Sequence, residues 1–237
     1  MRVLDLFCGA GGASRGYAMP GVEIVGVDWV EQRQYPYTFI KADAMTFPLD
    51  GFDVIHASPP CQGYARMRWY EHDNTWMLRH TIDRLAETDA AWFVENTNDV
   101  PYWHGHTFML CGASLGCITR DGSRLFLARH RKFWSNQSIN APECACRWYR
   151  KNGWVVAGVY GNSAGNGPGF KSIKSNTEQT NELMGIDWMV RRSIVEAVPP
   201  RYTRFIMHQW LNETMQTDSG RFGAPMDEQP TIRTEPA

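Results

Sequence analysis

The first hundred residues alternate short apolar runs with stretches compatible with helices. Helical patterns lie between these runs. Residues 13–18 predict a short helix. Thr75–Thr88 predicts a longer one, because its apolar residues recur about every 3.6 positions. Strands that alternate with helices favour a parallel sheet covered on both faces, so we expect a doubly wound, mostly parallel α/β fold. The runs expected to form strands are Val3–Phe7, Glu23–Val27, Phe39–Lys41, Val54–Ala57 and Trp92–Val94.

Composition narrows the class of protein. The chain has 237 residues, 43% of them hydrophobic, and a net charge of −1, which excludes a uniformly basic coat. No apolar stretch approaches the roughly 18 residues of a membrane helix, and Asp5 interrupts the apolar start in a way that a signal peptide does not. We expect one main globular domain with a cytoplasmic location and no membrane partner.

A glycine-rich turn follows the first expected strand. Gly9, Gly11 and Gly12 stand where the backbone can approach a ligand closely and where a helix begins. A glycine-rich turn is a weak signal by itself, because any tight turn needs glycines.

Polar and aromatic residues after the next two strands strengthen the case for a ligand. Asp28 can accept hydrogen bonds from both hydroxyls of a ribose, Trp29 can stack on an adenine, and Asp43 can accept from an exocyclic amine. Each has a structural alternative: Asp28 as a turn cap, Trp29 as core, Asp43 as a solvated acid. Their joint placement after successive strands predicts a pocket for an adenosine-containing cofactor.

A cysteine and a glutamate follow the fourth and fifth strands. Pro59 and Pro60 fix the backbone before Cys61, which orients its thiol at the end of a strand, and Glu95 stands at the end of the next strand. A thiol and a carboxylate facing an adenosine cofactor suggest covalent activation of an electrophile followed by group transfer.

These residues together resemble the DNA (cytosine-5) methyltransferase family, and within it the small, phage-type branch. The turn DLFCGAGG, the Asp28-Trp29 step, PPCQ at 59–62 and Glu95-Asn96 occur in the family's order, and the similarity touches residues 3 to about 206. Arg129-His-Arg131 matches its arginine-x-arginine motif, and AVPP at 197–200 resembles part of its closing motif. The sequence departs from the family pattern at Thr97, Leu127 and Glu196.

The resemblance implies a class I, Rossmann-like fold with S-adenosylmethionine as cofactor. It implies that Cys61 adds to cytosine C6, that Glu95 holds N3 and the amino group, and that Arg129 and Arg131 hold the carbonyl edge. The target base must leave the duplex to reach these groups. The implied cofactor contacts are Phe7, Gly9, Gly11, Gly12, Asp28, Trp29, Asp43, Ala44 and Pro59.

Two basic segments are candidates for nucleic-acid contact. After Cys61, Gln62, Arg66 and Arg68 predict a loop that closes over phosphates; the alternative is a solvated basic loop. Residues 119–151 carry eight Lys or Arg against two acids, with tryptophan and tyrosine interleaved. In that segment the candidate DNA contacts are Arg147, Arg150 and Lys151.

We expect four regions along the chain. Residues 1–134 form the catalytic domain, 135–180 a short target-recognition insert, 181–214 helices that complete the catalytic domain, and 215–237 a disordered tail. The later helices are expected at Gln179–Met184, Arg191–Val198 and Tyr202–Asn212.

The six cysteines predict reduced thiols in a chain of this size without a leader. Cys111, Cys117, Cys144 and Cys146 offer four thiolates to zinc, but their spacing is unlike that of zinc fingers. We therefore expect small apolar fillers and no metal.

The function predicted is methylation of cytosine C5 in double-stranded DNA by a monomer, in a bacterial or phage-infected cell, as in restriction–modification. One alternative changes the substrate to transfer RNA, on which some members of this family act. The other is a catalytically silent protein that binds the cofactor and nucleic acid; the short insert favours it, and the Cys61/Glu95 pair argues against it.

Overall fold

The structure is a computed structural model that describes residues 1–60, 75–97, 105–159 and 172–217. A seven-stranded sheet has the order β3-β2-β1-β4-β5-β8-β6, in which β3 to β5 are parallel and β8 runs antiparallel between β5 and β6. The strands are β1 (Arg2–Leu6), β2 (Glu23–Asp28), β3 (Thr38–Lys41), β4 (Val54–Ala57), β5 (Ala91–Thr97), β6 (His106–Cys111) and β8 (His130–Ser135). The predicted mostly parallel α/β sheet is confirmed.

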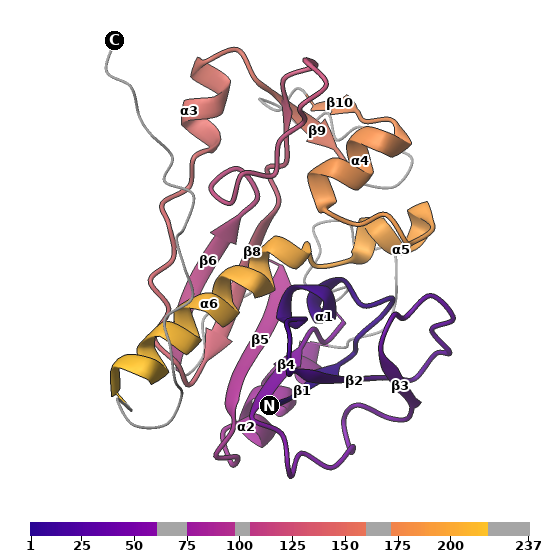
Figure 1. The fold of residues 1–237 in the computed structure, drawn as a ribbon, viewed down its shortest axis with the longest axis vertical. Coiled ribbons are helices and arrows are strands. Elements are labelled where there is room, and N and C mark those ends of the chain that lie inside the picture. The colour runs from indigo at the N-terminus through magenta and orange to yellow at the C-terminus, as the bar shows by residue number, and fades with distance from the viewer. Residues whose placement is uncertain (61–74, 98–104, 160–171, 218–237) are drawn as a thin grey trace.

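Helices cover both faces of this sheet (Figure 1). On one face α1 (Gly12–Tyr17) and α6 (Pro200–Thr217) pack together, and on the other lies α2 (Thr75–Leu85). Consecutive residues of β1 pack into opposite cores: Val3 belongs to the core beside α1 and α6, and Leu4 to the core beside α2. The chain order reverses at β1, which pairs with β2 and β4; in such sheets ligands bind outside the carboxyl ends of the strands at this point.

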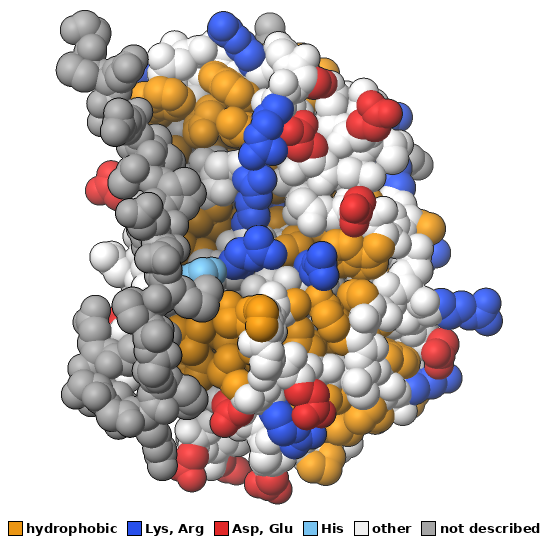
Figure 2. Space-filling view, in the orientation of Figure 1, with side chains coloured by type: hydrophobic (Ala, Val, Ile, Leu, Met, Phe, Trp, Pro, Cys, Tyr) orange, Lys and Arg blue, Asp and Glu red, His pale blue; other side chains and the backbone are white. Residues whose placement is uncertain are grey.

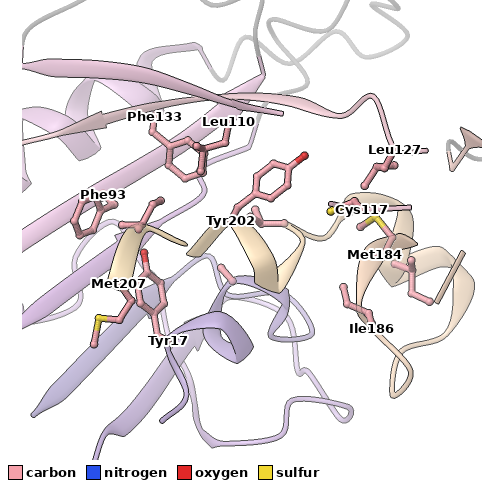
Figure 3. Close-up of a cluster of buried hydrophobic side chains, with 14 of the residues drawn as sticks. Tyr17, Phe93, Leu110, Cys117, Leu127, Phe133, Met184, Ile186, Tyr202 and Met207 are labelled. Atoms are coloured by element: carbon pink, nitrogen blue, oxygen red, sulfur yellow. The ribbon is translucent and has the colours of Figure 1, made fainter. Parts of the chain in front are cut away.

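The α1/α6 core is dense and aromatic (Figure 3). Phe93 and Phe133 face it from the sheet, while Tyr17 and Tyr202 enter from the helices, and all four are fully buried. The two helices approach closely because Gly16 has no side chain; a Cβ there would lie 1.9 Å from the hydroxyl of Thr203.

A second, small sheet has the order β10-β9-β7 and consists of β7 (Leu125–Phe126), β9 (Val155–Gly158) and β10 (Ser172–Lys174). Three short helices accompany it: α3 (Cys146–Lys151), α4 (Thr177–Met184) and α5 (Arg191–Glu196). The domain boundaries stay a prediction; β7 lies before the expected start of the insert at residue 135.

Several element bounds were predicted wrongly. Phe7 does not end β1 but has φ of 59° in the turn through which the chain passes from β1 to α1. Strand β5 continues to Thr97, so Glu95 lies within it, and α6 begins at Pro200 rather than Tyr202. Helix α6 also reaches Thr217, which places helix where the disordered tail was expected to begin; residues 218–237 lie outside the described part of the chain. None of the described helices is both long and apolar enough to span a membrane.

Candidate active site

The turn after β1 leaves space at one glycine and needs the small size of another. A Cβ at Gly9 would meet nothing within 4 Å, so the backbone there borders open space. At Gly12 a Cβ would lie 2.5 Å from the carbonyl oxygen of Val198, so the glycine lets the predicted closing motif pack on α1. Gly11 adopts φ of 88°, a left-handed conformation that glycine tolerates at this helix N-cap.

Asp28 holds this turn. Its two carboxylate oxygens accept hydrogen bonds of 2.9 Å from the backbone N–H groups of Gly9 and Val30, so the structural alternative of a turn cap is confirmed. A carboxylate offers about four acceptor positions, so two bonds leave room for ribose hydroxyls. Trp29 beside it is 73% exposed and therefore is not core, which leaves its ring face available for stacking.

Asp43 and Ala44 follow β3 at the same edge. Asp43 is exposed, and one of its oxygens accepts from the N–H of Met45 at 2.9 Å. Ala44 is 3% exposed and packs in the α2 core, so its side chain supports the loop. The described cofactor candidates thus lie at or after the ends of β1, β2 and β3, with Pro59 after β4; their contact with the cofactor stays a prediction.

The end of β4 is tied to the end of β5. Asn96 is buried and donates from Nδ2 to the carbonyl oxygen of Pro59 at 3.1 Å, while its Oδ1 accepts from the N–H of Thr97. Pro59 is itself buried. Cys61 lies outside the described residues, so the position of its sulfur stays a prediction. Asn96 is a positioning residue that the sequence analysis gave no role.

Glu95 and Arg131 form a buried ion pair at this edge. Nε of Arg131 lies 2.6 Å from Oε1 of Glu95, and their side chains are 14% and 9% exposed. The antiparallel pairing brings the carboxyl end of β5 next to the amino end of β8. Glu95 and Arg131, which were both predicted site residues, therefore lie on neighbouring strands at one edge of the sheet. Burial raises the pKa of Glu95, while Arg131, Arg129 and a hydrogen bond from Ser58 lower it; the net effect is a raised pKa.

A polar chain leads from Glu95 into the core. Ser58 hydrogen-bonds Glu95, Nε2 of His56 lies 2.9 Å from the Ser58 hydroxyl, and Nδ1 of His56 lies 3.1 Å from the Tyr17 hydroxyl. Burial lowers the pKa of His56 to about 3, so the ring is neutral at physiological pH. None of these three residues was among the predicted site residues; a histidine inside the apolar run Val54–Ala57 was the available signal.

Arg129 is fully enclosed. It is 1% exposed, Nη2 donates to the carbonyl oxygen of Val195 at 2.9 Å, and its own carbonyl oxygen accepts from the Tyr202 hydroxyl. Arg129 therefore connects β8 to α5 and α6. Its predicted contact with the base stays a prediction.

The described DNA-contact candidates lie on α3. Arg147, Arg150 and Lys151 are exposed on this helix, and Trp148 between them is 60% exposed. Figure 2 shows a further row of Lys and Arg side chains, which runs down the middle of the upper half of this face rather than over α3. The other candidates, Gln62, Arg66 and Arg68, lie outside the described residues.

Comparison with known proteins agrees with this geometry. The model of the family "C-5 cytosine-specific DNA methylase" matches residues 1–96, which include the glycine turn, Asp28, Cys61 and Glu95. No curated protein matches the chain.

Among solved structures, the fold is similar to that of the S. pombe Dnmt2 methyltransferase, with a TM-score of 0.56 and 10% identity over 90% of this chain and 99% of that one. A conserved hypothetical protein of Streptococcus pyogenes matches with a TM-score of 0.35 and 16% identity over 60% of this chain and 90% of that one. At such identities the first likeness supports the fold alone. The match to this family indicates that S-adenosylmethionine is the cofactor.

Residues 1–96 of the chain are thus similar to the C-5 cytosine-specific DNA methylase family, and the fold resembles that of a solved methyltransferase.

Proposed function

We propose that this chain methylates cytosine C5 in DNA through a covalent bond between Cys61 and C6 of a flipped-out base. The observation that carries the proposal is the buried pair of Glu95, near the carboxyl end of β5, and Arg131, near the amino end of the antiparallel strand β8, 2.6 Å apart. It lies beside the Pro59 carbonyl that Asn96 holds, two residues before Cys61. The proposal therefore gives each residue of the family's motifs a chemical task.

Cytosine C5 is a weak nucleophile, so the ring must first be activated. The Cys61 thiolate adds to C6. The π electrons of the C5–C6 bond then form a C4–C5 double bond, and those of the C4–N3 double bond move to N3, which takes up a proton. Glu95, held by its ion pair with Arg131, can relay that proton from water to N3. S-adenosylmethionine, which the glycine turn, Asp28 and Trp29 would hold, would supply the methyl group to C5 and depart as S-adenosylhomocysteine.

The ring is restored by elimination. A base takes the proton from C5, the C6–sulfur bond breaks, and Cys61 leaves as the thiolate while N3 gives up its proton. Because a base stacked within a duplex is covered by its neighbours, it must be flipped out of the helix to reach these groups.

The basic helix α3 supports a nucleic-acid substrate. Arg147, Arg150 and Lys151 are exposed there, and an exposed tryptophan lies among them. Phosphate contacts by such residues are independent of base sequence, so the helix accounts for affinity and positioning rather than specificity.

The proposed substrate is tested by methyl transfer. The full chain is incubated with methyl-labelled S-adenosylmethionine and either duplex DNA or total transfer RNA, and 5-methylcytosine is then mapped in the product. We expect label in DNA at a defined sequence. Label confined to transfer RNA would show that RNA, and not DNA, is the substrate. No label in either nucleic acid, although the cofactor binds, would support the catalytically silent alternative.

Asp28 gives a test of the cofactor pocket. Asp28→Ala removes a charged acceptor from the ribose and loosens the turn at Gly9, so S-adenosylmethionine binding should weaken by about 1.5–3 kcal/mol, or roughly 10- to 150-fold in the dissociation constant. Calorimetric titration measures it. Asp50→Ala removes an exposed loop acid and serves as the control. An unchanged dissociation constant for Asp28→Ala would show that Asp28 does not bind the ribose.

A further inference from the structure

Three cysteines and a histidine converge beside α3, away from the Glu95–Arg131 pair. Their ligand atoms, which are the sulfurs of Cys111, Cys144 and Cys146 and a ring nitrogen of His130, all lie within 4.8 Å of one another. From the sequence, these cysteines were expected to be small apolar fillers, and Cys117 was the fourth thiol considered for a metal site. The structure instead buries Cys117 in the main apolar core and supplies His130.

The distances are those of a tetrahedral site. With Zn–S bonds of about 2.3 Å and Zn–N bonds of about 2.0 Å, the edges of a tetrahedron are about 3.8 Å between sulfurs and about 3.5 Å between sulfur and nitrogen. The sulfur of Cys111 lies 3.3 Å from that of Cys146 and 3.8 Å from that of Cys144. Nε2 of His130 lies 3.2 Å from the Cys144 sulfur and 3.7 Å from the Cys146 sulfur.

The fold places these ligands independently of any ion. Cys111 ends β6 and His130 begins β8, and the antiparallel register makes them direct partners across the two strands. Cys144 and Cys146 arrive together at the start of α3. The connecting loop is fixed as well, because the Ser114 hydroxyl donates to the Glu143 carbonyl at 2.6 Å and accepts from the Ala145 N–H at 3.0 Å.

A disulfide does not account for the cluster. All four neighbouring thiols among the described residues, at 111, 117, 144 and 146, are free. The shortest sulfur–sulfur distance of 3.3 Å is well beyond the roughly 2.05 Å of a bond. A disulfide would also leave a third sulfur and an imidazole nitrogen converging on the same point without a reason.

We propose that Cys111, His130, Cys144 and Cys146 bind one structural Zn²⁺ ion. Three thiolates and an imidazole form a closed set that leaves no position for substrate, which is the signature of a structural rather than a catalytic site. Soft sulfur ligands in a tetrahedron favour zinc over magnesium, calcium or manganese.

The small sheet and α3 have little other stabilisation, so a bound ion would strengthen this part of the fold. The strands of the small sheet are only two to four residues long, and its local core contains just Cys111, Ala113, Phe126 and Cys146 as buried residues. A core this small stabilises little by apolar burial, and small domains commonly add a metal for that reason. The zinc ion fastens α3 to the edge of the large sheet.

The ion also connects two functional elements. His130 lies between Arg129 and Arg131, and Cys146 directly precedes Arg147 on α3. Zinc therefore holds the basic helix at a fixed place relative to the strand that carries Arg131, the partner of Glu95.

Metal content tests the proposal directly. The full chain, purified without chelators from zinc-supplemented cells, should carry about one zinc per chain by plasma mass spectrometry. Replacement with Co²⁺ should give the visible ligand-field bands of a tetrahedral site and the ultraviolet band of thiolate-to-cobalt charge transfer. Chelation should lower the melting temperature, with recovery on adding Zn²⁺ alone.

Variants assign the ligands. Cys144→Ser changes an exposed residue and should fold, yet lose most of the zinc and alter the cobalt spectrum, and His130→Asn should also lose the zinc. Cys117→Ala removes a cysteine outside the cluster and should keep one zinc per chain.

Three results would overturn the proposal. The first is a wild-type chain that carries no zinc and gives no tetrahedral cobalt spectrum; the second is Cys144→Ser with full zinc content and an unchanged spectrum. The third is a thiol count after denaturation without reductant that gives four rather than the six thiols of the sequence, which would indicate a disulfide. None of these readouts uses methyl transfer, so they do not depend on the proposed function.

Discussion

Cys61→Ser should abolish methyl transfer, with a loss of about 10⁴-fold or more in turnover. The reason is that the thiolate is the nucleophile, whereas a serine hydroxyl stays protonated near neutral pH and adds poorly to C6. Transfer of labelled methyl groups to DNA under single-turnover conditions measures the loss. Binding of S-adenosylhomocysteine should change by no more than about twofold, because the cofactor candidates other than Pro59 lie on other segments and the substitution leaves Pro59 in place.

The covalent step can be trapped. On DNA that contains 5-fluorocytosine, methyl transfer proceeds but the C5 fluorine cannot leave as a proton does, so Cys61 stays bound to C6. We expect a protein–DNA adduct that survives denaturing electrophoresis, appears only with S-adenosylmethionine present, and is absent for Cys61→Ser.

Cys117→Ala is the matched control for both assays. Burial raises the pKa of Cys117 to about 12, so its thiol is protonated at neutral pH and should be dispensable for the chemistry. If Cys61→Ser retained a tenth of the wild-type rate, or if the adduct formed equally well without Cys61, nucleophilic catalysis by this residue would be refuted.

The order of strands and the residues that follow them could be predicted because each signal is local. Apolar runs near Val3, Ile24 and Val54 predict strands, and glycines after the first strand predict a turn. Parallel strands bring their carboxyl ends to one edge, so Asp28 and Asp43 could be assigned to one side of the sheet before any contact was known.

Long-range pairing could not be predicted in the same way. The strands β6 and β8 were not predicted. The basic residues of β8, such as Arg131 and Lys132, hide the alternation of apolar and polar residues that indicates a strand, and the strands that pair with β8 are distant in the sequence. The contact of Arg131 with Glu95 depends on the antiparallel register of β8 beside β5, which the motifs imply only through the family resemblance.

The cysteine cluster shows the same limit. Cys144 and Cys146 are adjacent in sequence, but Cys111 and His130 meet them only because β6 pairs with β8. Considered by spacing alone, Cys117 was as good a candidate as Cys111, and His130 was assigned only to the space between two arginines.

Glu95→Gln should reduce turnover by about 10²- to 10⁴-fold, because the amide cannot deliver a proton to N3. It should also destabilise the fold. Arg131 is only 14% exposed, and removing one member of a buried pair leaves an uncompensated charge at a cost of about 3–5 kcal/mol. For a chain of this size, that corresponds to a melting temperature lower by roughly 6–20 °C. Glu87→Gln, at an exposed position, is the control.

A double variant separates the two effects. In Glu95→Gln/Arg131→Met the unpaired charge is gone and an apolar chain of similar length fills its place, so most of the lost melting temperature should return. Methyl transfer should not return, since both groups that face the base have been removed. Calorimetry and single-turnover rates on the same preparations give both quantities. Recovery of the rate together with the stability would show that Glu95 and Arg131 serve only the fold, whereas stable but inactive protein is the result expected if this pair carries the chemistry.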